Sequence, residues 1–184
     1  MVVEGQLKIL VVDDDPNVTE LLPVILANEG FRDVHCFLSS TEAFAALKRP
    51  HSTFECLILD IDMPDMNGIE LCAQARALSS YRNVPIIMLT ARRDEKTVRA
   101  AISAGASDYI TKPFDVLEIG VRVRMSAKLV QARRALEDRL ETKSSSGASS
   151  AAGKPSVTRN EIMNLFAEEL YESKPPRTSA AGTK

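Results

Sequence analysis

Residues 56–64 read CLILDIDMP, so an apolar run ends in the carboxylate of Asp60. Residues 7–15, LKILVVDDD, have the same form and end in Asp13, Asp14 and Asp15. Two buried parallel strands that each deliver acid at the carboxyl end predict a shared acidic pocket. Carboxylates packed together repel one another, so such a pocket favours a cation. Oxygen ligands with open positions suit Mg²⁺, which binds one or two carboxylates plus a phosphate. The pattern therefore favours phosphoryl chemistry on a carboxylate.

The composition limits the function classes. The chain has 184 residues, 45% of them hydrophobic, which suits one domain of ordinary size plus some extra. The net charge of −2 offers no overall basic excess, so we expect no direct contact with nucleic acid. No apolar stretch approaches the roughly 18 residues of a membrane span. The three cysteines form no CxxC pair, which argues against a zinc site and favours a reducing, cytoplasmic location.

Short apolar runs alternate with helical patterns along most of the chain. We expect strands near residues 7–12, 32–37, 55–60, 84–90 and 106–111, and helices near 16–29, 40–48, 67–78, 93–104 and 115–141. Strict alternation with continuously apolar strands predicts an α/β fold in which helices cover both faces of a five-stranded parallel sheet, a doubly wound arrangement. The crossovers are expected to be right-handed.

Local signals mark where the helices begin. Asp15 precedes Pro16, which predicts an N-cap followed by proline at the first helical position. Asn67 is the expected cap of the third helix, and Ser40 or Thr41 of the second.

The C-terminal third departs from the alternating pattern. An apolar stripe at helical spacing predicts that the last helix extends beyond the sheet; its members are Met125, Leu129, Ala132, Leu136 and Leu140. This extension is either a short coiled coil that joins two subunits or a solvated helical stalk. We expect a main domain over residues 5–127, the extension over 128–141, a flexible linker over 142–157, a short amphipathic helix over 158–172 and a disordered tail over 173–184. The short helix either docks on a partner or on the main domain, or is mostly disordered.

Two further strands end in polar residues at the same edge of the predicted sheet. The run at 85–89 delivers Thr90, and the run at 109–111 delivers Lys112. Asp60 is the candidate nucleophile, whose carboxylate would become an acyl phosphate. Asp14 and Asp60 are candidate direct ligands of Mg²⁺, and Asp13 a candidate ligand through water. Lys112 suits one phosphoryl oxygen as a compact cation, and the Thr90 hydroxyl suits another.

With these residues in place, the chain resembles the receiver domain of bacterial two-component response regulators. The matching segments are residues 9–16 (ILVVDDDP), 60–68 (DIDMPDMNG), 89–91 (LTA) and 105–114 (GASDYITKPF), within a resemblance over about residues 5–130. It implies a flavodoxin-like strand order of 2-1-3-4-5 with an extended C-terminal helix. It also implies that Asp60 accepts phosphoryl from a phosphohistidine on a sensor histidine kinase or a histidine phosphotransfer protein.

The resemblance assigns further roles. The backbone carbonyl of Asp62 would complete the Mg²⁺ ligands, and the Lys112–Pro113 bond would be cis. Tyr109 would be the switch aromatic, turning inward when Thr90 moves toward the phosphoryl group. Asp62 and Arg92 occupy the positions that tune the lifetime of the acyl phosphate in this family.

Three functions compete at this stage. The leading one is a phosphorylatable signalling switch, not an enzyme acting on an external substrate, that acts by phosphorylation-dependent binding of a downstream protein or in a phosphorelay. The second is the receiver portion of a longer regulator whose output domain lies beyond Lys184. A haloacid-dehalogenase-like phosphatase is disfavoured because residues 13–16, DDDP, lack that family's DxDx[TV] motif. A basic cluster on the last helix (Arg122, Arg124, Lys128, Arg133 and Arg134) is interpreted as a solvated helix face.

Overall fold

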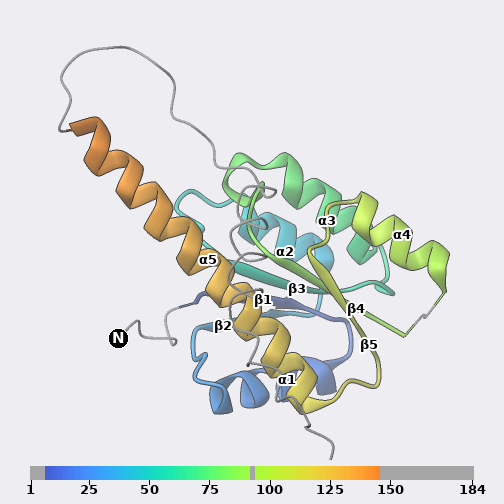
Figure 1. Ribbon diagram of the computed structural model, residues 1–184. Helices are drawn as coiled ribbons and strands as arrows, with labels where there is room; N and C mark the ends of the chain where they lie inside the picture. The colour runs from blue at the N-terminus through green and yellow to red at the C-terminus, as the bar shows by residue number, and fades with distance from the viewer. Residues whose placement is uncertain (1–6, 92–93, 146–184) are drawn as a thin grey trace, which may run out of the picture. The chain divides into compact units, whose positions relative to one another are not determined.

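The sheet has five parallel strands in the order β2-β1-β3-β4-β5, as predicted (Figure 1). The computed structural model describes residues 7–91 and 94–145, with side chains up to Glu141. The strands are β1 (Ile9–Val12), β2 (Val34–Phe37), β3 (Cys56–Asp60), β4 (Ile86–Thr90) and β5 (Asp108–Thr111). Each lies within two residues of its predicted bounds, because continuous apolar runs are confined to the buried length of each strand.

Helices cover both faces of the sheet. They are α1 (Pro16–Asn28), α2 (Ser40–Leu47), α3 (Gly68–Ala77), α4 (Glu95–Ser103) and α5 (Val116–Ser145), with a short 3₁₀ helix, η1 (Ser79–Tyr81), between α3 and β4. Figure 1 shows α1 and α5 on one side of the sheet and α2, α3 and α4 on the other. The doubly wound fold predicted from the alternation is therefore confirmed.

The side chains of β1 and β3 divide between two cores. Leu10 and Leu57 pack with α2 and α3, whereas Ile9 and Ile58 pack with α1 and α5. Since successive side chains of a strand point to opposite faces, a strand that is covered on both sides must be apolar at every position. This requirement produces the unbroken apolar runs that made the central strands recognisable.

The helix caps match the sequence signals with one difference. Asp15 accepts a hydrogen bond from the amide of Asn17 at 2.9 Å, and Asn67 accepts one from Glu70 at 2.9 Å. In α2, Ser39 rather than Ser40 or Thr41 is the cap: its backbone is extended, and its hydroxyl accepts from the amide of Glu42 at 3.4 Å.

Helix α5 ends at Ser145, four residues later than predicted. No proline or glycine interrupts the chain between Gly120 and Gly147, so nothing local stops the helix earlier. The chain divides into two compact units, Met1–Gln131 and Ala132–Lys184, and α5 contains the boundary. The remainder of the predicted linker, the short helix over 158–172 and the tail over 173–184 lie outside the described residues. Within residues 7–91 and 94–145, no helix has the length and apolar character needed to traverse a lipid bilayer.

Substitution of the fully buried Ile58 tests whether β3 is packed against helices on both faces. Ile58→Ala removes apolar volume between the sheet and helices α1 and α5, and we expect the free energy of unfolding to fall by about 2–5 kcal/mol. Val24→Ala on α1, where the side chain is 59% exposed, is the control and should change it by no more than about 0.5 kcal/mol. Urea denaturation measures both, and equal effects would contradict a core centred on β3.

Candidate functional site

Three strands bring charged side chains to one edge of the sheet. Asp13 directly follows β1, Asp60 is the last residue of β3 and Lys112 directly follows β5. The Lys112 ammonium nitrogen lies 2.7 Å from Asp13 Oδ2 and 2.7 Å from Asp60 Oδ1. The structure thus brings together side chains separated by up to 99 positions in the sequence, because parallel strands end at a common edge.

Burial makes this edge electrostatically unusual. Asp13 is fully buried and Asp60 is 3% exposed. Burial is the main cause that raises the pKa of each carboxyl above its ordinary value, and contact with Lys112 opposes the rise. Burial alone would lower the pKa of Lys112, but its contacts with Asp13 and Asp60 outweigh that effect and raise it. The lysine therefore stays charged and partly neutralises two buried acids.

The acidic side chains also fit a divalent cation. One carboxylate oxygen from each of Asp13, Asp14 and Asp60 lies within 4.8 Å of the other two. Asp13 Oδ2 is buried and, apart from its ion pair with Lys112, has no hydrogen bond of regular geometry. Asp14 is exposed, so the cluster opens to solvent on one side. An all-oxygen set of this kind suits Mg²⁺.

Thr90 and Lys112 are linked through the backbone. Thr90 is the last residue of β4, is 1% exposed and pairs with Thr111 of β5. Its carbonyl accepts a hydrogen bond from the amide of Lys112 at 2.7 Å. The Lys112–Pro113 peptide bond is cis, as the resemblance implied.

Gly68 lets α3 approach the end of β3. A Cβ at position 68 would overlap the carbonyl oxygen of Asp60 and lie 3.1 Å from the Cα of Ile61. The amide of Gly68 donates to the carbonyl of Ile61 at 3.1 Å, which holds the helix start against the strand end. This close approach of α3 to β3 requires glycine at position 68.

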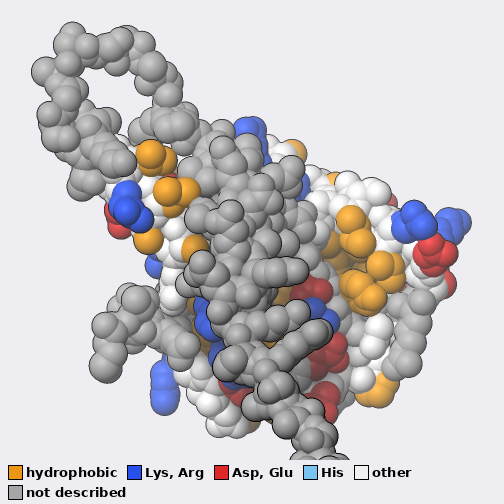
Figure 2. Space-filling model, viewed as in Figure 1, with side chains coloured by type: hydrophobic (Ala, Val, Ile, Leu, Met, Phe, Trp, Pro, Cys, Tyr) orange, Lys and Arg blue, Asp and Glu red, His pale blue; other side chains and the backbone are white. Residues whose placement is uncertain are grey.

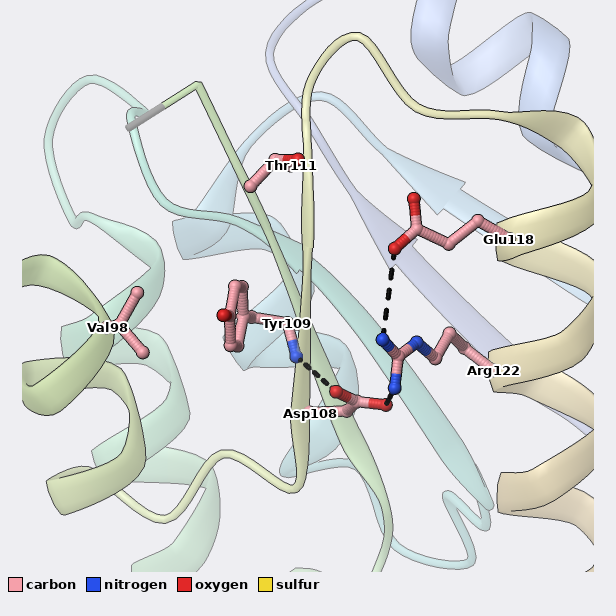
Figure 3. A pocket seen from close by; sticks show the side chains of 6 residues that line it. All are labelled: Val98, Asp108, Tyr109, Thr111, Glu118 and Arg122. Atoms are coloured by element: carbon pink, nitrogen blue, oxygen red, sulfur yellow. Dashed lines mark hydrogen bonds and ion pairs between the residues drawn. The ribbon is translucent and has the colours of Figure 1, made fainter. Parts of the chain in front are cut away.

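Tyr109 lies away from the acidic edge, on an open surface of the molecule. Its side chain is 39% exposed and lines a hollow of about 510 Å³ with Val98 of α4 and with Arg122 of α5. Figure 3 shows the ring directed toward Val98, and Arg122 paired with Asp108 at 2.9 Å. Figure 2 shows hydrophobic side chains gathered over the region of α4 and β5.

Asp62 and Arg92 are the two positions expected to tune the lifetime of the acyl phosphate. Asp62 follows Asp60 by two residues, and its side chain is exposed. It also lines a hollow of about 710 Å³ that reaches Thr97 of α4. Arg92 lies outside the described residues.

These features match one family of signalling domains. Residues 9–124 match the family model described as the response regulator receiver domain. The chain belongs to this family. The acidic edge, Lys112 and Thr90 all fall inside the matched residues.

Curated relatives are longer than the matched part of this chain. The DNA-binding response regulator MtrA of Mycolicibacterium smegmatis is 42% identical over 119 residues, which cover 64% of this chain and 49% of MtrA. The regulatory protein VanRc of Enterococcus gallinarum is 36% identical over 67% of this chain and 51% of VanRc. The chain thus spans about half the length of these relatives. Because MtrA is named as DNA-binding, the comparison gives no support to the expectation that this protein avoids nucleic acid.

Solved structures resemble the domain over most of their own length. A putative response regulator from Chloroflexus aurantiacus is 34% identical with a TM-score of 0.60 and covers 65% of this chain and 96% of its own. The receiver domain of the sensor histidine kinase PA1611 from Pseudomonas aeruginosa, with a magnesium ion in its active-site cleft, is 27% identical with a TM-score of 0.59 and covers 67% of this chain and 98% of its own.

Gly68→Ala tests the close approach of α3 to Asp60. The added methyl group must displace the helix start or the strand end, so we expect a loss of about 1–3 kcal/mol of unfolding free energy. The amide and carboxyl resonances of Asp60 should shift with it. Gln74→Ala, on the exposed face of the same helix, is the control. Unchanged Asp60 resonances in Gly68→Ala would contradict the contact.

Proposed function

We propose that this protein is a phosphorylatable signalling switch that accepts a phosphoryl group on Asp60. The donor would be a phosphohistidine on a sensor histidine kinase or a histidine phosphotransfer protein. The observation that carries the proposal is the Lys112 ammonium held 2.7 Å from a carboxylate oxygen of both Asp13 and Asp60. A cation beside a cluster of acids that opens to solvent at Asp14 is suited to receiving an anionic phosphoryl group.

The transfer is a displacement at phosphorus. A carboxylate oxygen of Asp60 forms the new O–P bond while the P–N bond to the imidazole breaks, and the released imidazole nitrogen takes a proton from water. Lys112 would turn from the two carboxylates toward a phosphoryl oxygen, and the hydroxyl of Thr90 would donate to another. The domain would catalyse only its own phosphorylation and dephosphorylation.

Mg²⁺ is the proposed cofactor. Asp14, Asp60 and the backbone carbonyl of Asp62 would hold it directly, and Asp13 through water; the cluster of three carboxylates supports this assignment. When bound, the ion supplies positive charge that offsets repulsion between the carboxylates and the incoming phosphoryl group.

The signal would leave the site through Thr90 and Tyr109. Thr90 would move toward the phosphoryl group and vacate space into which the Tyr109 ring turns. The outward ring, 39% exposed beside Val98 and Arg122, supports Tyr109 as the mobile element. The surface of α4, β5 and α5 would then change and be recognised by a downstream protein or by the next component of a phosphorelay.

Asp62 and Arg92 are the proposed tuning residues for the lifetime of the acyl phosphate. Asp62 lies two residues after Asp60 and its side chain is exposed, so its carboxylate would steer or repel an attacking water molecule. The free cysteines Cys36, Cys56 and Cys72 support a reducing, cytoplasmic location.

A second candidate is the receiver portion of a longer regulator. The relatives MtrA and VanRc, of which this chain covers 49% and 51%, support it. Under this proposal an output domain beyond Lys184 would carry the downstream activity, including any contact with DNA. The complete open reading frame separates the two candidates.

Asp60→Asn should abolish labelling by acetyl phosphate, because the amide cannot form the acyl phosphate. Asp65→Asn, which removes an acid from the same loop, should label like the wild type, and chelation of Mg²⁺ should suppress labelling in both. Intact mass spectrometry measures the added phosphoryl group. Undiminished labelling of Asp60→Asn would refute the assignment of the phosphoacceptor.

Lys112→Ala should separate phosphorylation from its structural consequence. Without the ammonium group, the phosphoryl group loses a partner that draws β5 toward the site, so the acetyl-phosphate-dependent shift of the Tyr109 amide resonance should be lost. Lys48→Ala removes an exposed lysine that directly follows α2 and is the control. A full Tyr109 shift in Lys112→Ala would remove the proposed role of Lys112.

The extension of α5 is the proposed site of homodimer formation. Leu136 and Leu140 are partly exposed there. Truncation after Gln131 leaves the buried Val130 in place, so the domain should stay folded while the dimer population falls. Light scattering at matched concentrations measures the mass, and an unchanged value for the truncated chain would contradict pairing through the extension.

A further inference from the structure

Arg76, in the last turn of α3, donates hydrogen bonds to four acceptors on other segments. Its Nε lies 2.9 Å from the carbonyl oxygen of Gly105. Its Nη1 lies 2.6 Å from the carbonyl oxygens of both Tyr81 and Val84. Its Nη2 lies 3.4 Å from the hydroxyl of Ser107. A planar guanidinium with five N–H donors can serve this set, whereas a lysine ammonium lacks the fork that reaches all four.

The acceptors lie in the two segments that lead into β4 and β5. Val84 comes two residues before β4, and Ser107 immediately precedes β5. Ser107 also joins the two strands directly: its amide donates to the carbonyl of Ile86 at 2.7 Å, and its hydroxyl accepts from the amide of Ile86 at 3.2 Å. From outside the sheet, Arg76 therefore contacts Ser107, the residue that forms the first hydrogen bonds between the start of β4 and the start of β5.

The turn before β5 is shaped around the arginine. Gly105 has φ +100°, a conformation that favours glycine, and a Cβ at this position would lie 2.9 Å from Cγ of Arg76. The neighbouring Cys72 of α3 donates to the carbonyl of Ala104 at 3.5 Å. The hydrogen bonds of Arg76 with Gly105 and of Cys72 with Ala104 therefore tie the turn between α4 and β5 to α3.

Strand β5 needs such a constraint because its own pairing is short. It is an edge strand of four residues with β4 as its neighbour. Of the four residues of β5, Ile110 alone is buried, so burial specifies the register weakly, and a slip of one residue turns every side chain to the opposite face. It also moves the strand by about 3.3 Å. A slip of β5 would therefore remove both 2.7 Å contacts of Lys112 with Asp13 and Asp60.

We infer that Arg76 is a positioning residue: it fixes the register of β5 on β4 at the start of the strand, and so places Lys112 between Asp13 and Asp60 at its end. The inference rests on the proposed function in so far as Lys112 serves phosphoryl transfer. The amide of Lys112, which donates to the carbonyl of Thr90 at 2.7 Å, reports on this register without reference to phosphorylation.

The experiment compares full-length variants by amide hydrogen exchange and by acetyl phosphate labelling with Mg²⁺. Arg76→Lys keeps the charge but loses the fork, Arg76→Gln loses both, and Ser107→Ala is a milder change that preserves the bonds from Arg76 to backbone carbonyls. Tyr81→Phe is the matched control. It removes the 3.0 Å hydrogen bond from the Tyr81 hydroxyl to the carbonyl of Ser52 while leaving the Tyr81 carbonyl available to Arg76.

Protection of the Lys112 amide, taken relative to the Leu57 amide of β3, should fall about tenfold or more in Arg76→Lys and Arg76→Gln. The rate of labelling should fall about tenfold or more with it, and Ser107→Ala should show smaller changes in the same direction. In Tyr81→Phe, the Lys112 and Leu57 amides should change together and labelling should stay near that of the wild type.

Two results would overturn the inference. The first is a Lys112 amide whose protection follows that of Leu57 in the Arg76 and Ser107 variants. The second is wild-type labelling in Arg76→Lys together with lost protection, which would separate the register from the site. A third outcome separates the two proposals. If the wild type takes no label, but the Lys112 amide loses protection relative to the Leu57 amide in the Arg76 variants, the proposed function fails and the positioning role of Arg76 stands.

Discussion

The Lys112 ammonium lies 2.7 Å from carboxylate oxygens of both Asp13 and Asp60 and is the cation that allows these two buried acids to lie at one edge of the sheet. Two buried carboxylates side by side are unfavourable, and burial is the main cause that raises the pKa of both. A single cation offsets part of this cost and leaves the exposed Asp14 free to face solvent. The site is therefore stable enough to form in the folded protein and remains suited to taking up further positive charge.

The scaffold is built to deliver these groups to one edge. Strands β1 and β3 are central and covered on both faces, which gives Asp13 and Asp60 a rigid base. Lys112 instead follows an edge strand of four residues, so its position depends on contacts outside the sheet. Arg76 supplies such contacts at the start of β5, and Gly68 allows α3 to pack directly against the end of β3. The two acids therefore follow central strands, whereas the lysine follows an edge strand that is held partly by contacts from α3.

Much of the fold and of the site was predictable because the signals are local. A strand covered on both faces must be apolar throughout, and a chain that crosses back through a helix must alternate between the two periodicities. Polar residues at the carboxyl ends of such strands must meet at one edge, so the sequence predicts that Asp13, Asp60, Thr90 and Lys112 lie together. The boundaries were less accurate: Ser39 caps α2, and α5 continues to Ser145, because caps and helix ends depend on backbone conformation that composition does not encode.

The sequence alone predicted the alternation of strands and helices, the acids at the strand ends and a lysine at the same edge of the sheet, since each follows from the period or terminus of one segment. Tertiary structure alone decided which atoms touch: the overlap that requires glycine at position 68, the outward ring of Tyr109 and the four acceptors gathered around Arg76. Arg76 had no local signal, because an arginine in the last turn of a helix is ordinary, and its acceptors lie as far as 31 positions away. Contacts of this kind arise only when packing brings distant segments together.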